Sequence, residues 1–179
     1  MSSVVSQKKT KSKRTKANQK IDNVLYTHSV ITRQVNLPII NIGKNIMQTF
    51  ESVIKTQYEG KCSVEGYIKP GTTNIISYSA GKMSGNVVSF QVVFTCEICT
   101  PVEGMFIQCV ASNITKAGIR AHTKEMPSPV VIFIARDHYY DSDEFNNIKE
   151  GDNITVKVIG CRFELYDTQI SIIAEIYSN

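Results

Sequence analysis

The residues of this 179-residue chain most able to do chemistry are four potential zinc ligands: Cys96, Cys99, Cys109 and His122. Two thiolates separated by two intervening residues, with another thiol and an imidazole nearby, are typical of zinc sites. A second close pair of ligands is missing, however, and positions three apart on a strand point to opposite faces of a sheet. We therefore expect reduced, buried thiols and no bound metal. A zinc-dependent redox or nucleic-acid enzyme remains a distant alternative.

A second group of candidates is acidic, and consists of Asp137, Asp141, Asp143 and Glu144. Clustered carboxylates can bind a cation, but this segment lacks the glycine and the terminal glutamate of a calcium loop, so solvated acids are expected. The three histidines fall in different segments, and no glycine-rich phosphate loop is present. The sequence therefore predicts a protein with no catalytic residues and no cofactor.

Cationic and aromatic residues offer a third kind of chemistry, contact with single-stranded RNA, which needs ring faces for stacking and cations along its backbone. One group of candidates lies on and beside a predicted strand: Lys116, Arg120, His122 and Lys124. A second group follows the next predicted strand: Arg136, His138, Tyr139 and Tyr140. The tyrosines could equally brace the fold or meet another protein, and both interpretations stay open.

The elements that must position these residues differ between the two halves of the chain. In the first half, β-branched residues predict a strand over residues 24–35. Apolar residues at three- and four-residue steps then predict a core-facing helix that opens near Pro38 and ends at Gly60. Further strands are expected at 61–68, 74–80 and 87–95. The simplest packing lays the helix on this antiparallel sheet, which makes an α+β domain.

The second half is predicted to be almost entirely β-structure. Its expected strands cover residues 105–111, 117–122, 130–134, 153–163 and 168–176. The longest connection, an acidic and aromatic loop at 136–150, lies between the third and fourth strands. Strand number and order match a five-stranded OB barrel, a fold used by many proteins that hold single-stranded nucleic acid.

Charge divides the chain into three predicted parts: a disordered basic arm at 1–22, a tip domain at 23–100 and a barrel at 101–179. The arm carries seven basic side chains and one acidic side chain. The tip domain carries six basic and four acidic side chains, and the barrel seven basic and eleven acidic ones. The arm could contact nucleic acid or an acidic protein surface, serve as an import or packaging signal, or make only weak contacts. The acidic barrel predicts weak RNA binding. No apolar run long enough for a membrane span is present, and no secretory signal opens the chain.

Three segments resemble a known family. Glu59-Gly60-Lys61-Cys62 is followed by Gly66-Tyr67-Ile68, the strand at 90–94 leads to Pro101 and Glu103-Gly104, and residues 114–118 form a turn. In order and spacing these segments resemble the larger stalk subunit of multi-subunit DNA-directed RNA polymerases, which is the seventh subunit of RNA polymerase II or its archaeal counterpart. The resemblance covers residues 24–177, and the amino-acid sequences of these segments are most similar to versions of the subunit encoded by large DNA viruses.

The resemblance implies a truncated ribonucleoprotein-like tip, docked on the large core subunits beside the clamp, and an OB barrel near the RNA exit path. It implies weak contact with nascent RNA and, in cellular enzymes, a smaller stalk partner. The docking residues it implies are Glu59, Gly60, Lys61, Cys62, Gly66 and Tyr67. We therefore expect a non-catalytic polymerase subunit inside the host cell, in the cytoplasm or nucleus, or in the virion. A free-standing OB-fold protein that binds RNA, and acts on messenger RNA or in translation, is the alternative.

Overall fold

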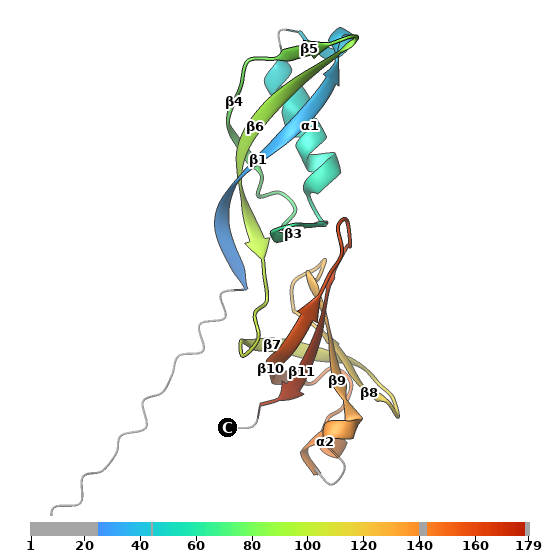
Figure 1. Ribbon diagram of the computed structural model, residues 1–179. Helices are drawn as coiled ribbons and strands as arrows, with labels where there is room; N and C mark the ends of the chain where they lie inside the picture. Colours follow the sequence, from blue (N-terminus) through green and yellow to red (C-terminus); the bar gives the residue numbers. More distant parts are fainter. Residues whose placement is uncertain (1–24, 44, 140–142, 178–179) are drawn as a thin grey trace, which may run out of the picture.

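The fold is described from a computed structural model, in which residues 25–43, 45–139 and 143–177 are placed well enough to describe. The predicted basic arm, Tyr140 and Asp141 lie outside these residues. Within them the chain forms a helix-bearing sheet at one end of an elongated molecule and a β-barrel at the other (Figure 1). The strand β6 (Val87–Cys99) runs down from the sheet toward the barrel and leads into it.

The sheet is organised around β6. The strand β1 (Tyr26–Pro38) pairs with it along its whole length, from Tyr26 opposite Cys99 to Pro38 opposite Val87. The other edge of β6 holds three short strands in succession: β3 (Gly66–Ile68), β4 (Asn74–Tyr78) and β5 (Lys82–Ser84). The two-residue strand β2 (Cys62–Ser63) pairs with β3 and forms the outer edge. All these pairings are antiparallel, as the sequence predicted.

The segment predicted as one strand at 61–68 is in fact two short strands. Val64 and Glu65 form the turn between them, and Gly66 opens β3 with a φ of +136°, where an added Cβ would lie 2.5 Å from the carbonyl oxygen of Cys99. Only glycine can bring its backbone this close to a neighbouring strand without strain. The chain therefore turns sharply between β2 and β3 and reverses direction.

The helix α1 (Ile46–Tyr58) begins later than the sequence predicted. Pro38 does not open it, because Pro38 is the last residue of β1, extended at φ −58° and ψ 141° and paired with Val87. A single 3₁₀ turn at Ile39–Asn41 follows before the helix. The helix buries Phe50 and Ile54, and the Phe50 ring meets the edge of the Phe90 ring on β6 with 5.1 Å between centroids.

The second half of the chain forms a closed barrel. Its strands are β7 (Phe106–Ile114), β8 (Gly118–His122), β9 (Val130–Ala135), β10 (Asn153–Arg162) and β11 (Ile170–Ile176), within a few residues of their predicted bounds. The order around the barrel is β10-β11-β9-β8-β7, closed by pairing of β10 with β7. The β9–β11 pair is parallel and the others are antiparallel. This arrangement is consistent with an OB barrel.

The connection between β9 and β10 contains short helical turns, where the sequence predicted only a loop. Residues Arg136–His138 form a 3₁₀ turn and Asp143–Asn147 a short helix, α2. Phe145 anchors α2 to the barrel, because its side chain is 2% exposed and belongs to the barrel core. In the described part of the chain, no helix combines the length and apolar character needed to cross a bilayer.

Candidate docking and nucleic-acid surfaces

The predicted docking segment lies at the joint between the sheet and the barrel. Cys62 and Tyr67 are buried there, 2% and 1% exposed, and together with Cys99 they pack into the same core cluster as the barrel strands. Glu59, Gly60 and Lys61 are half-buried, and Gly66 is buried. The buried members of this set therefore hold the two halves of the chain together and have little surface left for another protein.

Backbone hydrogen bonds seal the joint. The N–H of Cys62 donates to the carbonyl of Asp167 at 2.7 Å, and the N–H of Tyr166 donates to the carbonyl of Cys62 at 2.8 Å. Asp167 and Tyr166 lie in the turn between β10 and β11, whose tip reaches toward β3 (Figure 1). The turn thus adds a short strand-like pairing to the outer edge of the sheet, where β2 would otherwise be exposed.

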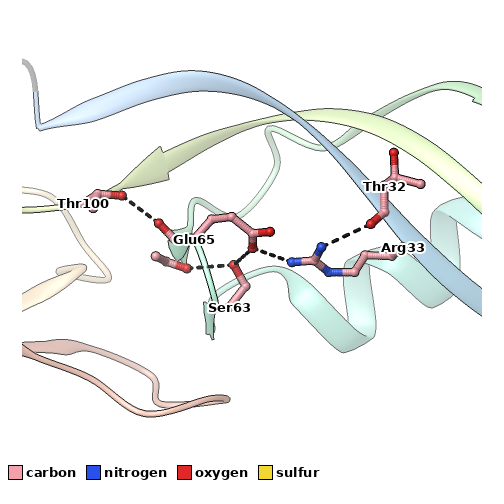
Figure 2. A network of polar contacts seen from close by, with 6 residues as sticks. Thr32, Arg33, Ser63, Glu65 and Thr100 are labelled. Atoms are coloured by element: carbon pink, nitrogen blue, oxygen red, sulfur yellow. Dashed lines mark hydrogen bonds and ion pairs between the residues drawn. The ribbon is translucent and has the colours of Figure 1, made fainter.

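A polar network centred on Glu65 joins β1, the β2–β3 turn and the start of the link to the barrel (Figure 2). The carboxylate of Glu65 accepts a very short hydrogen bond from Arg33 on β1 and one of 2.9 Å from Ser63. Its backbone carbonyl accepts a 2.9 Å hydrogen bond from the hydroxyl of Thr100, in the link to the barrel. Burial favours the protonated carboxyl, but the bonds from Arg33 and Ser63 outweigh it and lower the pKa of Glu65.

A second bridge crosses the joint through Lys69. Its ammonium group lies 4.3 Å from the ring centroid of Tyr26, 3.3 Å from the carboxylate of Glu97 and 3.9 Å from that of Glu125, which belongs to the β8–β9 loop of the barrel. Burial, together with a hydrogen bond and the negative charge of Glu125, raises the pKa of Tyr26. Cation–π and ionic contacts thus tie the start of β1 to the barrel.

The far end of the sheet carries an exposed apolar patch that the sequence prediction missed. We call it the distal patch: Ile39, Ile40, Met83 and Val87 are 49%, 88%, 65% and 38% exposed. The N–H of Ile39 bonds to the carbonyl of Asn86 at 3.0 Å, and β5 pairs with the start of β6, so these residues lie at the same end of the sheet. Met83 stands opposite Val88 and therefore points to the other face of the sheet from Val87. Ile39 was predicted to face the core, because its spacing continues the helical stripe. A patch of this kind is typical of an interaction surface.

The predicted RNA residues on β8 and at its two ends lie on the outside of the barrel. Lys116, Arg120 and Lys124 are exposed and His122 is half-buried. Arg120 pairs directly with Phe133 on β9, and Phe133 pairs with Ile173 on β11. Phe133 is 39% and Ile173 52% exposed. A guanidinium therefore stands beside an exposed aromatic ring, the combination that binds a phosphate and stacks a base.

Phe133 was missed because the run 130–134 is short and apolar and predicts a strand buried on both faces. Its alternation in fact places Val130, Ile132 and Ile134 inside the barrel and Phe133 outside. Beside this row a hollow of about 450 Å³ is lined by Arg120, His122 and residues of the β8–β9 loop. The outer face of β8 and β9 is therefore the candidate nucleic-acid surface.

The second predicted RNA group has a structural role where it can be described. The ring of Tyr139 stacks on Phe145 with 5.5 Å between centroids, and its hydroxyl accepts a hydrogen bond from the N–H of Ile176. The guanidinium of Arg136 lies 5.0 Å from the centre of the Phe145 ring. These contacts support the interpretation of Tyr139 as a brace of the barrel. The side chains of His138 and Tyr140 lie outside the described residues.

Known proteins resemble this chain over both of its halves. No protein-family model matches the chain. The putative DNA-directed RNA polymerase subunit L376 of Acanthamoeba polyphaga mimivirus is 28% identical over 153 residues, covering 76% of this chain and 72% of the relative. The DNA-directed RNA polymerase II subunit RPB7 of Glycine max is 24% identical, and subunit 7 of the Arabidopsis thaliana enzyme 23%. Each match covers 78% of this chain and 86% of the relative. Over about three quarters of its length the chain is similar to the seventh subunit of RNA polymerase II.

This relationship confirms the resemblance found in the sequence, and the mimivirus relative agrees with the expectation of a version encoded by a large DNA virus. The relatives named as the seventh subunit span both the sheet and the barrel, since a match of 156 residues is longer than either half. The relationship therefore applies to the two-part architecture and not to the barrel alone.

The zinc alternative gains no support from the positions of the cysteines in the structure. Cys96 packs into the core of the sheet, whereas Cys99 and Cys109 pack into the core of the barrel. Burial raises the pKa of Cys99 and of Cys109 to about 12, so both stay protonated at neutral pH. Among the described residues, no group of three or more potential ligands is placed to hold a metal ion.

Proposed function

We propose that this chain is a non-catalytic stalk subunit of a DNA-dependent RNA polymerase. Its sheet half, with α1 packed on it as a truncated ribonucleoprotein-like tip, would dock on the core beside the clamp. Its barrel would guide nascent RNA. The observation that carries the proposal is the sealed joint: two folded halves are fused into one adaptor, and the relatives that span both halves are named polymerase subunits.

The docking surface is best assigned to the distal patch. It lies at the end of the sheet farthest from the barrel, so docking there would leave the barrel free (Figure 1). The predicted segment at 59–68 instead supports the joint, and only its turn residues Val64 and Glu65 are well exposed. Apolar side chains in the centre of an interface commonly carry most of its binding energy.

Affinity purification of the tagged chain from producing cells tests both the function and the docking site. We expect the two largest polymerase subunits to co-purify. Ile40→Asp, at a side chain 88% exposed, should reduce their recovery at least tenfold, whereas Val64→Asp, at 81% exposed, should not. Loss of the polymerase subunits with Val64→Asp but not with Ile40→Asp would assign docking to the 59–68 segment. Purification of the wild-type chain without polymerase subunits would favour a free-standing RNA-binding protein.

The RNA surface is assigned to Arg120 and Phe133. Because the described body is not strongly basic, affinity for RNA alone should be micromolar or weaker at physiological salt. Crosslinking of nascent transcript to the assembled polymerase is the appropriate assay. Phe133→Ser should reduce crosslinking to the barrel, whereas Ile173→Ser, which removes an exposed apolar neighbour without a ring, should reduce it less.

The same purification addresses the remaining partners. A smaller stalk subunit, if the enzyme has one, should be recovered in equal amount with the chain. We further propose that the protein acts inside the host cell, in the cytoplasm or the nucleus, and is packaged in the virion. Imaging of a tagged chain during infection, and analysis of purified virions, test this placement.

A further inference from the structure

The exposed ring of Phe133 belongs to a row of residues that crosses four strands of the barrel. Phe133 on β9 is paired on one side with Arg120 of β8 and on the other with Ile173 of β11. Ile173 is paired in turn with Gly160 of β10. Because paired residues share a face of the sheet and Phe133 and Ile173 are exposed, this cross-strand row lies on the outside of the barrel.

A guanidinium stands at each end of this face. Arg120 occupies the β8 end. At the β10 end, Arg162 is paired with Ser171, two positions along β11 from Ile173 and therefore also on the outside. Arg162 donates a hydrogen bond to Glu164 at 2.7 Å, with the two side chains 82% and 70% exposed. So exposed an ion pair contributes little, and a guanidinium has further N–H donors, so Arg162 can still bind a phosphate.

The spacing of the strands sets the length of nucleic acid that fits the cross-strand row. Arg120 and Gly160 are three strand spacings apart, which is about 14 Å at about 4.8 Å each. At about 3.4 Å per stacked nucleotide, this distance corresponds to about four nucleotides. A site of about four nucleotides is at the lower end of the range for single OB folds.

The other cations on this side of the barrel suggest a competing path along β8, where Lys116, Arg120 and Lys124 recur at every fourth position. That path leads into the β8–β9 loop, which is held in place by a buried 2.9 Å hydrogen bond between the hydroxyls of Thr123 and Ser128. The cross-strand row instead places an exposed ring and an exposed isoleucine between two guanidiniums. Stacking surfaces flanked by cations are what a single strand requires.

Given the proposed function, on which this inference rests, we propose that single-stranded RNA crosses the strands of the barrel from Arg120 to Arg162. One base stacks on Phe133 and the next rests on Ile173, while the two guanidiniums bind phosphates on either side. Gly160 has open space where a side chain would be, so the RNA backbone can approach β10 closely. The sequence prediction named no RNA contact on β10 or β11.

The acidic side of the row explains why the path turns toward Arg162. Glu175 follows Ile173 on β11 by two positions, opposite to the direction of Ser171, and its carboxylate accepts a 3.1 Å hydrogen bond from Lys157 of β10. A carboxylate beside the row repels phosphate, and Lys157 is already engaged by it. Lys157 therefore offers a matched control: it is a β10 cation in an ion pair, on the unfavourable side of the row.

The test measures binding of the full chain to a fluorescent oligoadenylate by anisotropy, with about eight nucleotides and between about 50 and 200 mM KCl. On a single strand, each phosphate contact contributes about 0.7 to the slope of log affinity against log salt concentration. Arg162→Ser should therefore lower this slope by about 0.7, whereas Arg162→Lys should keep it. Lys157→Ser and Lys116→Ser should each lower it by less than about 0.3.

An unchanged slope with Arg162→Ser would overturn the proposed path. A larger loss with Lys116→Ser than with Arg162→Ser would overturn it as well, and would show that RNA runs along β8. Unchanged affinity with Phe133→Ser would overturn the path together with the RNA surface. Circular dichroism checks that each variant is folded. Recovery of polymerase subunits with the same variants separates these results from the proposed function: an Arg162→Ser chain that still co-purifies polymerase but keeps its full slope refutes the path alone.

Discussion

Replacing Tyr67 with alanine should destabilise the sheet and the barrel together. Tyr67 is on β3 of the sheet, yet it is 1% exposed and packs in the core cluster of the barrel. A buried aromatic side chain removes roughly 150–250 Å² from water, worth at most about 4–6 kcal/mol at about 25 cal/mol per Å². Measured aromatic-to-alanine losses of about 3–5 kcal/mol agree with this upper limit. We therefore expect Tyr67→Ala to cost about 3–5 kcal/mol of unfolding free energy.

The matched control is Tyr78→Ala. Tyr78 is also on the sheet and contacts the rings of Phe50 and Phe90, but it is 43% exposed and far along β6 from the joint. Because Tyr78 buries only about half of its side-chain area, Tyr78→Ala is expected to cost about 1–2 kcal/mol of unfolding free energy. This substitution should leave the barrel unaffected.

Urea unfolding followed by far-ultraviolet circular dichroism measures both costs, and hydrogen exchange locates them. Tyr67→Ala should lower the protection of amides on β9 of the barrel as well as on β6 of the sheet, because one core includes both halves. Tyr78→Ala should lower protection on β6 alone. A Tyr67→Ala cost below about 1 kcal/mol, or unchanged protection on β9, would refute the shared core.

Three other substitutions and reactions have definite expected outcomes. Glu65→Gln should cost about 1 kcal/mol or less at pH 7, since the ion pair with Arg33 is partly exposed. Because the pKa of Glu65 is lowered from its usual 4.5, this contribution is present above about pH 4.5 and disappears as pH falls through the folded-state pKa; a difference that persists in urea titrations at pH 2 would contradict it. Gly118→Ala should cost about 2 kcal/mol or more, because the added Cβ would lie 2.2 Å from a carbonyl oxygen at a φ of +157°. Gly160→Ala, with open space and no such φ, should have little effect on the melting temperature. A disulfide reagent at pH 8 should react quickly with one thiol per folded chain, Cys161, since the other four are buried; a second fast thiol counted by absorbance would show that the core opens.

The barrel could be predicted from the sequence almost strand by strand. Most of its strands place apolar residues at alternate positions, β9 is a short unbroken apolar run, and glycine and polar residues mark the turns between strands. The helix was predicted in the right region but begins too early, because the apolar spacing of Ile39 and Ile42 continues that of Ile46. Pairing of Pro38 with Val87, which ends the strand there, is a tertiary contact with no local signal.

The candidate surfaces were harder to predict for the same reason. Cys62 of the motif at 59–62 is bonded to the β10–β11 turn, which lies more than a hundred residues later in the chain and has no local signal at the motif. The distal patch joins residues from either side of α1, and only the folded sheet brings them together. Arg120 was predicted from its type, whereas its partner Phe133 becomes visible only through the register of β8 and β9.

The pairing of Cys62 with the β10–β11 turn has a consequence during synthesis. The sheet half leaves the ribosome first, and its outermost strand then has unpaired N–H and C=O groups until the last hairpin of the chain is made. An open strand edge of this kind recruits other chains. A fragment ending near Thr100 should therefore self-associate. When the separately made barrel is added, its β10–β11 hairpin should cover the open edge of the sheet and prevent this self-association.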